Sequence, residues 1–452
     1  MRRVALQRAG QVVDRRVPGS ERASIPGWVG ALLLIAAIAL PLLRQRGAHS
    51  WDTIFSEDGP VYAGQALHEG GFNVLLRGYA GYLQLSPRLV ALMVPLVPLR
   101  DLALFMALAG STVNALLAWF VYCQSRGWIT SPALRIALAS SIVLGPVLLG
   151  ENTANITNTI WAFAAVAPWA LCSREERPAS VVGRSAVAFL AATSTALAFL
   201  YLPIAAVAAF SRRTRATAIV VGTFVGGLVV QGLVVLSSSQ QPSLPGNSAI
   251  DLMQQLGVRV FWFLMLGPRW TAALWASPPL AAALIGPLVF LGLMVLVGWD
   301  AGRRAQVAAM LVAVTAVVMF AVPSWGRGTA ALALVGADVT SSTLVVRFTV
   351  VPIFLLLSAI AILVGDPERA PAPWLATVAI ALVVQIAVLG AVNFRGANSR
   401  SFAPNGNDWP PWRSTVETAW ERSCDGAPSD KEVVLPATVS YSMTVTCGDI
   451  GP

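Results

Sequence analysis

Long apolar runs separated by short polar segments dominate the pattern of this sequence. After a first run at 26–43, apolar stretches lie at about 87–98, 102–123, 136–150, 159–172, 185–199, 200–210, 217–236, 278–299, 305–322, 348–364 and 374–392. Runs of about 18 or more apolar residues are typical of helices that cross a membrane. Several stretches are shorter, and broken helices occur at membrane depth only where protein or a water-filled cavity surrounds them. The pattern predicts an all-α polytopic membrane protein that encloses a polar cavity.

The composition excludes several other classes of protein. Of the 452 residues, 56% are hydrophobic and 12% are charged, and the mean hydropathy is +0.68. A soluble domain has roughly 45–50% apolar and roughly 25% charged residues. A water-soluble enzyme, a disordered chain and a collagen-like rod are therefore excluded. A membrane β-barrel would instead show short segments of alternating hydrophobicity.

The net charge of +9 comes almost entirely from arginine, since Lys431 is the single lysine among 31 basic residues. The arginines lie mostly at the ends of apolar runs, where cytoplasmic loops collect positive charge. No basic stripe with interleaved aromatic residues is present, so we expect no nucleic-acid partner. The bias toward Arg, Ala, Val and Leu is typical of a high-GC bacterial genome.

The positions of the arginines predict how the chain is oriented in a bacterial plasma membrane. Six arginines precede residue 26, and the run at 26–43 is longer than a signal-peptide core and lacks a cleavage site, so it is a first span with a cytoplasmic N-terminus. Basic clusters at 174–184, 212–215 and 303–304 are also expected to be cytoplasmic. This gives 11 or 13 spans and an extracytoplasmic C-terminus. The expected organisation is a cytoplasmic segment at 1–25, a transmembrane domain at 26–392 with outer loops at 44–86, 151–158, 237–276 and 323–347, and an extracytoplasmic tail at 393–452.

The tail carries signals of its own. The segment WRSTVETAWERSC places its apolar residues on one face of a helix, and EVVLPATVSYSMTVTC is typical of two strands. Cys424 and Cys447 both lie in this tail, where disulfides persist, and we expect them to be bonded. A metal pair is less favoured because no histidine accompanies them. Cys123 and Cys172 lie at span ends and are expected to be free thiols.

Two adjacent carboxylates stand out in the first outer loop, in the segment Ser56-Glu57-Asp58-Gly59. Adjacent carboxylates at a membrane surface suit a general base or part of a ligand set for a hard cation. The alternative is structural, because Asp58-Gly59-Pro60 also has the composition of a turn.

Arginines outside the cytoplasmic clusters are candidates for binding phosphate. Arg88 follows the proline that opens a span, Arg259 lies in the third outer loop, and Arg347 leads directly into an apolar run. Arginine binds phosphate through two parallel hydrogen bonds, and basic residues within a membrane protein are functional candidates by default. Anchoring at the membrane interface is the structural alternative.

Aromatic, amide and acidic side chains in two outer loops complete the set of candidates. Such groups suit the hydroxyls of a sugar, although tyrosines also anchor helices at membrane interfaces and asparagines also cap helices. The residues concerned are Tyr79, Tyr82, Glu151, Asn155, Asn158 and Trp161. No Walker motif is present to suggest ATP hydrolysis. The apolar runs hold few ionisable residues, which disfavours an ion-coupled carrier.

These motifs together resemble the GT-C superfamily of integral-membrane glycosyltransferases, in an uncharacterised bacterial branch of polyprenyl-phosphate-sugar-dependent type. The resemblance covers about residues 26–452. It is carried by SEDGPVY at 56–62, GYAGY at 78–82 followed by Pro87-Arg88, Asn155-x-x-Asn158-x-x-Trp161, and Arg347-Phe348 before Val351-Pro352.

The resemblance implies an inverting transfer of a hexose or pentose from a polyprenyl-phosphate-linked donor to an envelope glycan or glycolipid on the outer face. Asp58 or Glu57 would act as the catalytic base. Arg347, Arg88 and Arg259 would bind the donor phosphate, and the aromatic and amide candidates would contact sugar or acceptor. We expect no cofactor and no metal requirement. The alternative is a non-enzymatic translocator of lipid or polysaccharide, or a binding subunit of an envelope-assembly complex.

Overall fold

The computed structural model describes residues 25–44, 49–145, 154–238, 248–274, 279–326, 343–369, 372–394, 411–438 and 441–451. Within these ranges the main body is built from helices, and six segments are long and apolar enough to cross a membrane. They are Leu99–Gly127, Arg215–Ser237, Ala249–Thr271, Leu280–Gly298, Arg303–Trp325 and Pro373–Val392. Further apolar helices of 10–17 residues accompany them. The all-α, multi-pass class expected from the sequence agrees with this architecture, and the count of 11 or 13 spans stays a prediction.

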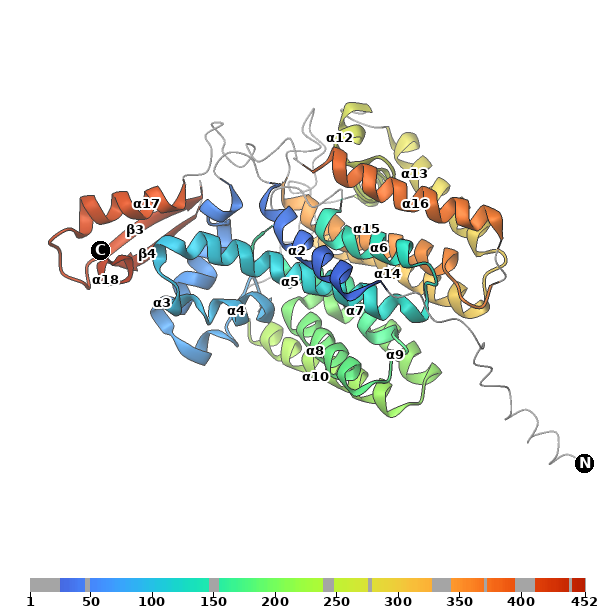
Figure 1. Ribbon diagram of the computed structural model, residues 1–452, viewed down its shortest axis with the longest axis horizontal. Coiled ribbons are helices and arrows are strands. Elements are labelled where there is room, and N and C mark those ends of the chain that lie inside the picture. Colours follow the sequence, from blue (N-terminus) through green and yellow to red (C-terminus); the bar gives the residue numbers. More distant parts are fainter. Residues whose placement is uncertain are drawn as a thin grey trace, which may run out of the picture.

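The helices follow one another along the chain in the order coloured in Figure 1. The long ones are α5 (Leu102–Gln124), α10 (Arg215–Ser237), α13 (Leu280–Gly298), α14 (Arg303–Gly326), α15 (Thr343–Val364) and α16 (Pro373–Val392). The shorter ones are α2 (Gly27–Leu42), α3 (Gly64–Glu69), α4 (Leu85–Ala91), α6 (Pro132–Leu144), α7 (Thr159–Cys172), α8 (Pro178–Ser194), α9 (Leu202–Ser211), α11 (Ala249–Leu256), α12 (Phe263–Leu274), α17 (Trp412–Ala419) and α18 (Cys447–Ile450).

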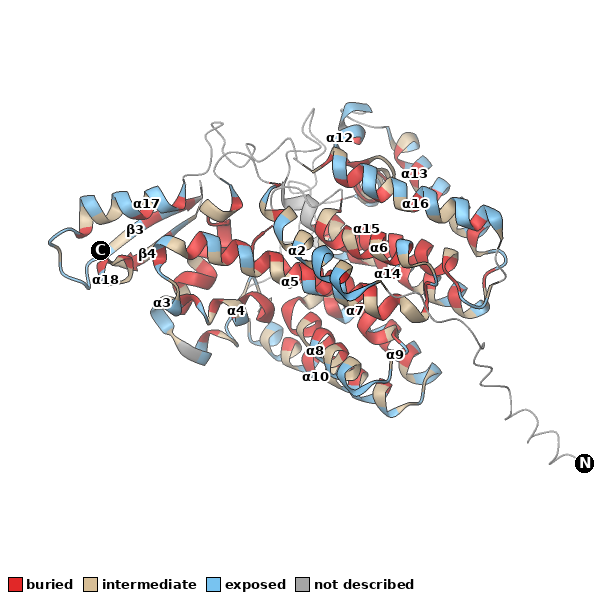
Figure 2. Cartoon of the chain, in the orientation of Figure 1, coloured by how far each residue is buried: buried red, intermediate tan, exposed pale blue. Residues whose placement is uncertain are grey.

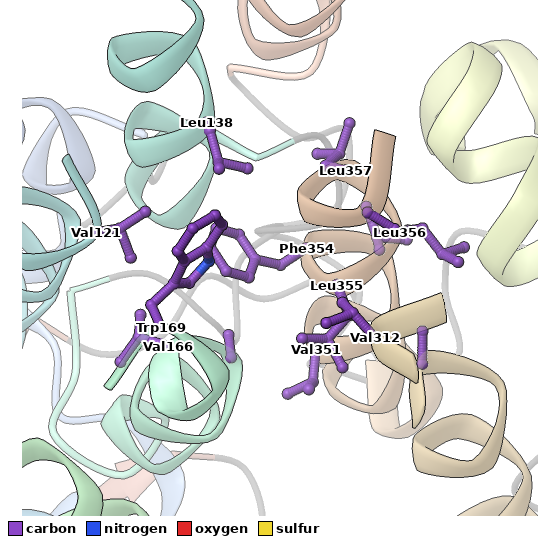
Figure 3. Close-up of a cluster of buried hydrophobic side chains, with 14 of the residues drawn as sticks. Val121, Leu138, Val166, Trp169, Val312, Val351, Phe354, Leu355, Leu356 and Leu357 are labelled. Carbon is purple, nitrogen blue, oxygen red and sulfur yellow. The ribbon is translucent and has the colours of Figure 1, made fainter. Parts of the chain in front are cut away.

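Helices α7 and α15 form the centre of the helical body. Every residue of α7 from Thr159 to Leu171 is buried, and Figure 2 shows α7 and α15 in the buried colour among their neighbours. Trp169 from α7 and Phe354 from α15 belong to the buried cluster between the two helices (Figure 3), and Trp169 Nε1 donates a hydrogen bond of 3.3 Å to Ser358 Oγ. A helix that is apolar all round is buried in the middle of a helical protein. Helix α7 has only 14 residues. It is apolar on every side because other helices surround it.

Helices α13 and α16 lie at the outside of the body and show the opposite pattern. Leu288 and Leu296 on α13 are 65% and 61% exposed, and Ile380 on α16 is 64% exposed. Large apolar side chains on the surface of a soluble protein rarely form such continuous faces. These faces are suited to contact with lipid, as expected for membrane-spanning helices.

The segment expected to be an outer loop at 237–276 is helical over most of its length, and its place relative to the membrane stays a prediction. The structure places α11, a π-helical segment Gly257–Trp262 and α12 there. The segment Ala249–Thr271 has a mean hydropathy of 1.3, against 2.6 for Leu280–Gly298. Polar residues such as Asp251 and Arg259 lower the hydropathy of this helix, so the apolar pattern did not reveal it.

The first loop and the C-terminal tail form a second, smaller core at one end of the molecule (Figure 1). Strands β3 (Glu432–Thr438) and β4 (Tyr441–Thr446) pair as an antiparallel hairpin, and a disulfide joins Cys424 to Cys447. Trp412 Nε1 donates to the carbonyl oxygen of Leu99 at 2.7 Å. The helix and two strands expected in the tail are therefore present, and they cover the loop that carries the two carboxylates.

Candidate functional site

Asp58 joins the first loop to the segment that leads into α7. It ends a 3₁₀ turn, Ser56–Asp58, that runs directly into the π-helical segment Gly59–Ala63. Its Oδ2 accepts a hydrogen bond from the backbone nitrogen of Ile156 at 3.1 Å. Its Oδ1 accepts one from the backbone nitrogen of Thr157 at 2.9 Å and another from the Thr157 hydroxyl. The carboxylate therefore fixes the relative positions of two loops that are about 100 residues apart in sequence.

The environment of Asp58 raises the pKa of its carboxyl group to about 7. The side chain is 1% exposed, and burial raises the pKa of Asp58 to about 7, while the bonds from Thr157 and Ile156 lower it and the charge of Glu57 raises it further. Loss of hydration disfavours the ionised carboxylate, and the three donors offset part of that cost. A carboxylate with a pKa near 7 matches the proton affinity that general-base catalysis requires at neutral pH.

A buried arginine lies on the other side of the first loop. Arg88 on α4 is 1% exposed, and its Nη1 donates to Gln65 Oε1 at 3.0 Å. Its guanidinium carbon lies 5.7 Å from the centre of the Tyr62 ring. Its Nε and Nη2 have no hydrogen-bond partner among the described residues. Arg88 thus presents unused N–H donors inside the protein, where leaving them unpaired is costly.

Tyr62 connects this arginine to the carboxylates. It lies four residues after Asp58 and is 1% exposed, and its hydroxyl donates to Gln84 Oε1. Burial raises the pKa of Tyr62, and the charges of Asp58 and Glu57 raise it further while that of Arg88 lowers it. The Tyr62 ring therefore lies near Arg88 and follows Asp58 by four residues along the chain.

Helix α4 is tied to the same segment that Asp58 holds. Ser86 Oγ lies 3.1 Å from Thr159 Oγ1, and the backbone nitrogen of Ser86 donates to Ser194 Oγ at 3.0 Å. The chain at the start of α7 therefore contacts both elements: Ile156 and Thr157 bind Asp58, and Thr159 contacts α4, which carries Arg88. Two candidates that are 30 residues apart in the sequence are thus held by the same segment.

The segment before α7 is itself closely constrained. Ala154 has a φ of +50°, an uncommon conformation for a residue other than glycine. Asn155 Oδ1 accepts from the backbone nitrogen of Asn158 at 2.9 Å, and Asn158 Oδ1 accepts from Trp161 Nε1 at 3.1 Å. The two amide oxygens are thus engaged in shaping the turn. Glu151 lies outside the described residues.

The two tyrosines of the first loop lie in a short hairpin. Strands β1 (Gly78–Tyr79) and β2 (Tyr82–Leu83) are antiparallel and place Tyr79 opposite Tyr82. Gly81 in the turn has a φ of +86°, a conformation that glycine adopts without strain. The chain continues from β2 to Gln84, whose Oε1 accepts the hydrogen bond from the Tyr62 hydroxyl. The hairpin is therefore linked to Tyr62 through Gln84.

The other two candidate arginines differ in position. Arg347 belongs to the first turns of α15, and its side chain lies outside the described residues. The next residue, Phe348, meets Trp161 edge-to-face with 5.5 Å between ring centres, which brings this end of α15 to the entry of α7. Arg259 is fully buried in the π-helical segment Gly257–Trp262, which packs against α11, α13 and α15. The described contacts do not link Arg259 to the carboxylates.

Three contributors to this arrangement escaped the sequence reasoning. Tyr62 lies inside the motif SEDGPVY but was not singled out, although its position four residues after Asp58 was a usable signal. Gln65 accepts one hydrogen bond from Arg88 and Thr157 donates two to Asp58, and such bonds leave no pattern in the sequence. Within the described ranges no three histidine, cysteine or acidic side chains come together as a metal site.

Comparison of the chain with protein-family models, curated proteins and solved structures finds no match.

Proposed function

We propose that the protein is a membrane glycosyltransferase that moves a sugar from a polyprenyl-phosphate-linked donor to an envelope acceptor. One observation carries the proposal. Asp58, with a pKa of about 7, lies four residues before Tyr62, and the Tyr62 ring faces the buried Arg88, which has two nitrogens without partners in the described structure. Such a transfer requires a proton acceptor and donors for the departing phosphate.

Asp58 is the proposed base because its Oδ2 accepts a single hydrogen bond within the described structure, which leaves a lone pair for a proton. An acceptor hydroxyl gives its proton to this oxygen as its own oxygen bonds to the anomeric carbon. The bond between that carbon and the donor phosphate oxygen breaks at the same time. The electron pair leaves with polyprenyl phosphate, so the configuration at the anomeric carbon inverts.

Arg88 is the proposed partner of the departing phosphate. Its Nε and Nη2 supply the two donors that a phosphate accepts side by side. Negative charge grows on the leaving oxygen as the bond breaks, so these hydrogen bonds strengthen in the transition state. Arg347 is a further proposed ligand of the phosphate because the next residue, Phe348, contacts Trp161 near the start of α7. Arg259 lies in a segment that packs against α11, α13 and α15, and its role at the donor phosphate stays a prediction.

The cellular setting is part of the proposal. The loops around Asp58 and the disulfide-containing tail lie on the outer face of a bacterial plasma membrane, and the transmembrane domain is of GT-C type with 11 or 13 spans. The donor is a membrane lipid, and the acceptor is an envelope glycan or glycolipid. The shared core of first loop and tail supports placing both on one side of the membrane.

The test is release of free polyprenyl phosphate from labelled polyprenyl-phosphate sugars by membranes that contain the full chain. Wild type is compared with Glu57→Gln and Asp58→Asn, with expression and detergent-extracted folded protein measured for each. Loss of release in the Asp58 variant alone supports the assignment of the base, and loss in the Glu57 variant alone moves that role to Glu57. Turnover in a chelator tests the expectation that no metal is required.

A second candidate function rests on the hydrogen bonds of Asp58. Because both of its oxygens accept bonds from the segment before α7, the residue also fits a protein that binds or translocates a lipid-linked glycan without chemistry. In that case no donor offered is cleaved, the lipid still co-purifies with the protein, and both carboxylate variants retain it.

A further inference from the structure

A cavity of about 700 Å³ lies at the opposite end of α7 from Asp58. Helix α7 begins at Thr159, close to the Asp58 carboxylate, and ends at Cys172, which lines the cavity. Its 14 residues span about 21 Å at 1.5 Å per residue. The cavity is therefore separate from the site proposed above, and what it binds does not depend on whether that site is catalytic.

Positive charge dominates the lining of this cavity. Among the residues that the structure describes, its charged lining consists of Arg174, Arg184, Arg212, Arg303, Arg304 and Glu176. Three of the arginines surround one aromatic ring, since the guanidinium carbons of Arg304, Arg174 and Arg212 lie 4.7, 5.4 and 5.7 Å from the centre of Trp128. Glu368 approaches two of them, at 3.8 Å from Arg174 and 3.9 Å from Arg304. The nearby carboxylates are too few to neutralise the arginines.

Arg184 gives the cavity an unused donor. The residue is 1% exposed, its Nε donates to the carbonyl oxygen of Ala170 at 2.8 Å, and its Nη1 donates to that of Glu175 at 2.9 Å. Its Nη2 has no hydrogen-bond partner among the described residues. The charges of Glu175 and Glu176 act on Arg184, but its buried Nη2 still lacks a hydrogen-bond acceptor in the described part of the chain, which is costly. An anion in the cavity would supply that acceptor.

The remaining wall of the cavity is apolar and reaches the surface of the helical body. It consists of side chains from α9 and α14, among them Ile204, Val207 and Val307. Val207 and Val307 are 41% and 49% exposed, and α14 belongs to a candidate membrane span. A free inorganic anion would leave this apolar wall uncovered. A molecule with a charged head and an apolar chain fits both parts of the lining.

We propose that this cavity binds an anionic phospholipid. The phosphate accepts hydrogen bonds from Arg184 and Arg304, and an acyl chain lies along Val207 and Val307 between α9 and α14. The arginine clusters at 174–184, 212–215 and 303–304, which the sequence presents as markers of orientation, thereby acquire a binding role.

The test is retention of lipid by the full-length protein, purified in detergent and measured by native mass spectrometry. Phosphatidylglycerol is compared with phosphatidylcholine of the same acyl chains, and inorganic phosphate is added in a separate series. Arg304→Gln removes a cavity arginine whose side chain is 38% exposed, so the variant is expected to fold. Arg213→Gln is the matched control, because Arg213 is exposed and does not line the cavity. Arg184→Gln is the stronger variant but also removes bonds to the end of α7.

The proposal expects phosphatidylglycerol to be retained in preference to phosphatidylcholine. Arg304→Gln should weaken that retention about fivefold, as expected for one arginine at a lipid phosphate, and Arg213→Gln should leave it unchanged. Equal loss in the two variants shows that arginines act only through the general positive charge of this face and overturns the proposal. Equal retention of the two lipids, or displacement of phosphatidylglycerol by millimolar inorganic phosphate, also overturns it.

Discussion

A buried arginine with unused hydrogen-bond donors lies near each end of α7, but the neighbours of the two arginines differ. Arg88 at one end and Arg184 at the other are each 1% exposed, and each has nitrogen donors without a described partner. Around Arg88 lie Tyr62 and Gln65, whereas around Arg184 lie backbone carbonyls, further arginines and the charges of Glu175 and Glu176. Unused donors alone make a place for an anion. The end of α7 near Arg88 also carries Asp58, a buried carboxylate with a pKa of about 7, which can support transfer of a proton.

The two ends also differ in how they are held. The carboxylate end is fixed by bonds between distant parts of the chain, such as Asp58 to Thr157 and His68 Nε2 to the carbonyl oxygen of Thr444 at 2.9 Å. The arginine end is formed by helix ends that meet around Trp128. Catalysis requires fixed geometry, whereas lipid binding tolerates movement. The comparison therefore predicts that substitutions at one end leave the function of the other intact.

Asp58→Asn should have the largest effect, and it should change sugar transfer without changing lipid binding at the other end of α7. Removing a positioned base typically lowers the rate by about 10²–10⁴-fold, so release of polyprenyl phosphate should fall by that factor. Retention of phosphatidylglycerol should not change, because α7, which is about 21 Å long, separates the segment that Asp58 holds from the cavity. Both quantities are measured on the same purified protein. A parallel loss of lipid retention would show general misfolding and break the comparison.

Arg88→Gln should have the next largest effect. The substitution removes charge-assisted hydrogen bonds, each contributing about 1.5–3 kcal/mol, so kcat/KM for the donor should fall about 10- to 100-fold. Arg77→Gln is the matched control, since the Arg77 side chain is 48% exposed and pairs with Glu69 at the surface. The measurement is a donor titration for each variant. A similar fall for Arg77→Gln would assign the effect to overall charge and contradict a phosphate site at Arg88.

Gly110→Ala should affect the carboxylate end through packing alone. A Cβ at position 110 on α5 would collide with the backbone of Asn155, in the segment that Asp58 holds. Overpacking of this kind costs about 1–3 kcal/mol, so thermal stability and the release rate should both fall. Gly226→Ala on α10 is the control because nothing lies within 4 Å of its Cβ position. Equal behaviour of the two variants in thermal unfolding would show that the contact does not constrain the site.

The sequence was sufficient for the helical membrane class and for the location of the carboxylates, because both are local. Apolar runs reveal helices that contact lipid on one face or are buried all round, such as α16 and α7. They failed at 237–276, where Arg259 and other polar residues lie within a helix. The role of Asp58 depends on Thr157, and that of Arg88 on Gln65. Such pairings are formed by tertiary packing, and a single sequence contains no record of them.

The smallest expected effect concerns the hydroxyl of Thr157 and the pH dependence of release. That hydroxyl donates to Asp58 and lowers its pKa, so Thr157→Val should raise the pKa of Asp58 above about 7. The base acts only when it is deprotonated, and activity is therefore lost as pH falls through this pKa. In Thr157→Val the loss of activity should begin at a pH about 1 unit higher than in wild type. In alkaline buffer the variant should release polyprenyl phosphate at the wild-type rate. Thr223→Val on α10 is the control, since Thr223 Oγ1 donates to the carbonyl oxygen of Ile219 at 2.8 Å and not to Asp58. A shift of the profile in the control, or none in Thr157→Val, would remove Asp58 from the role of base and leave it as the residue that fixes the loop.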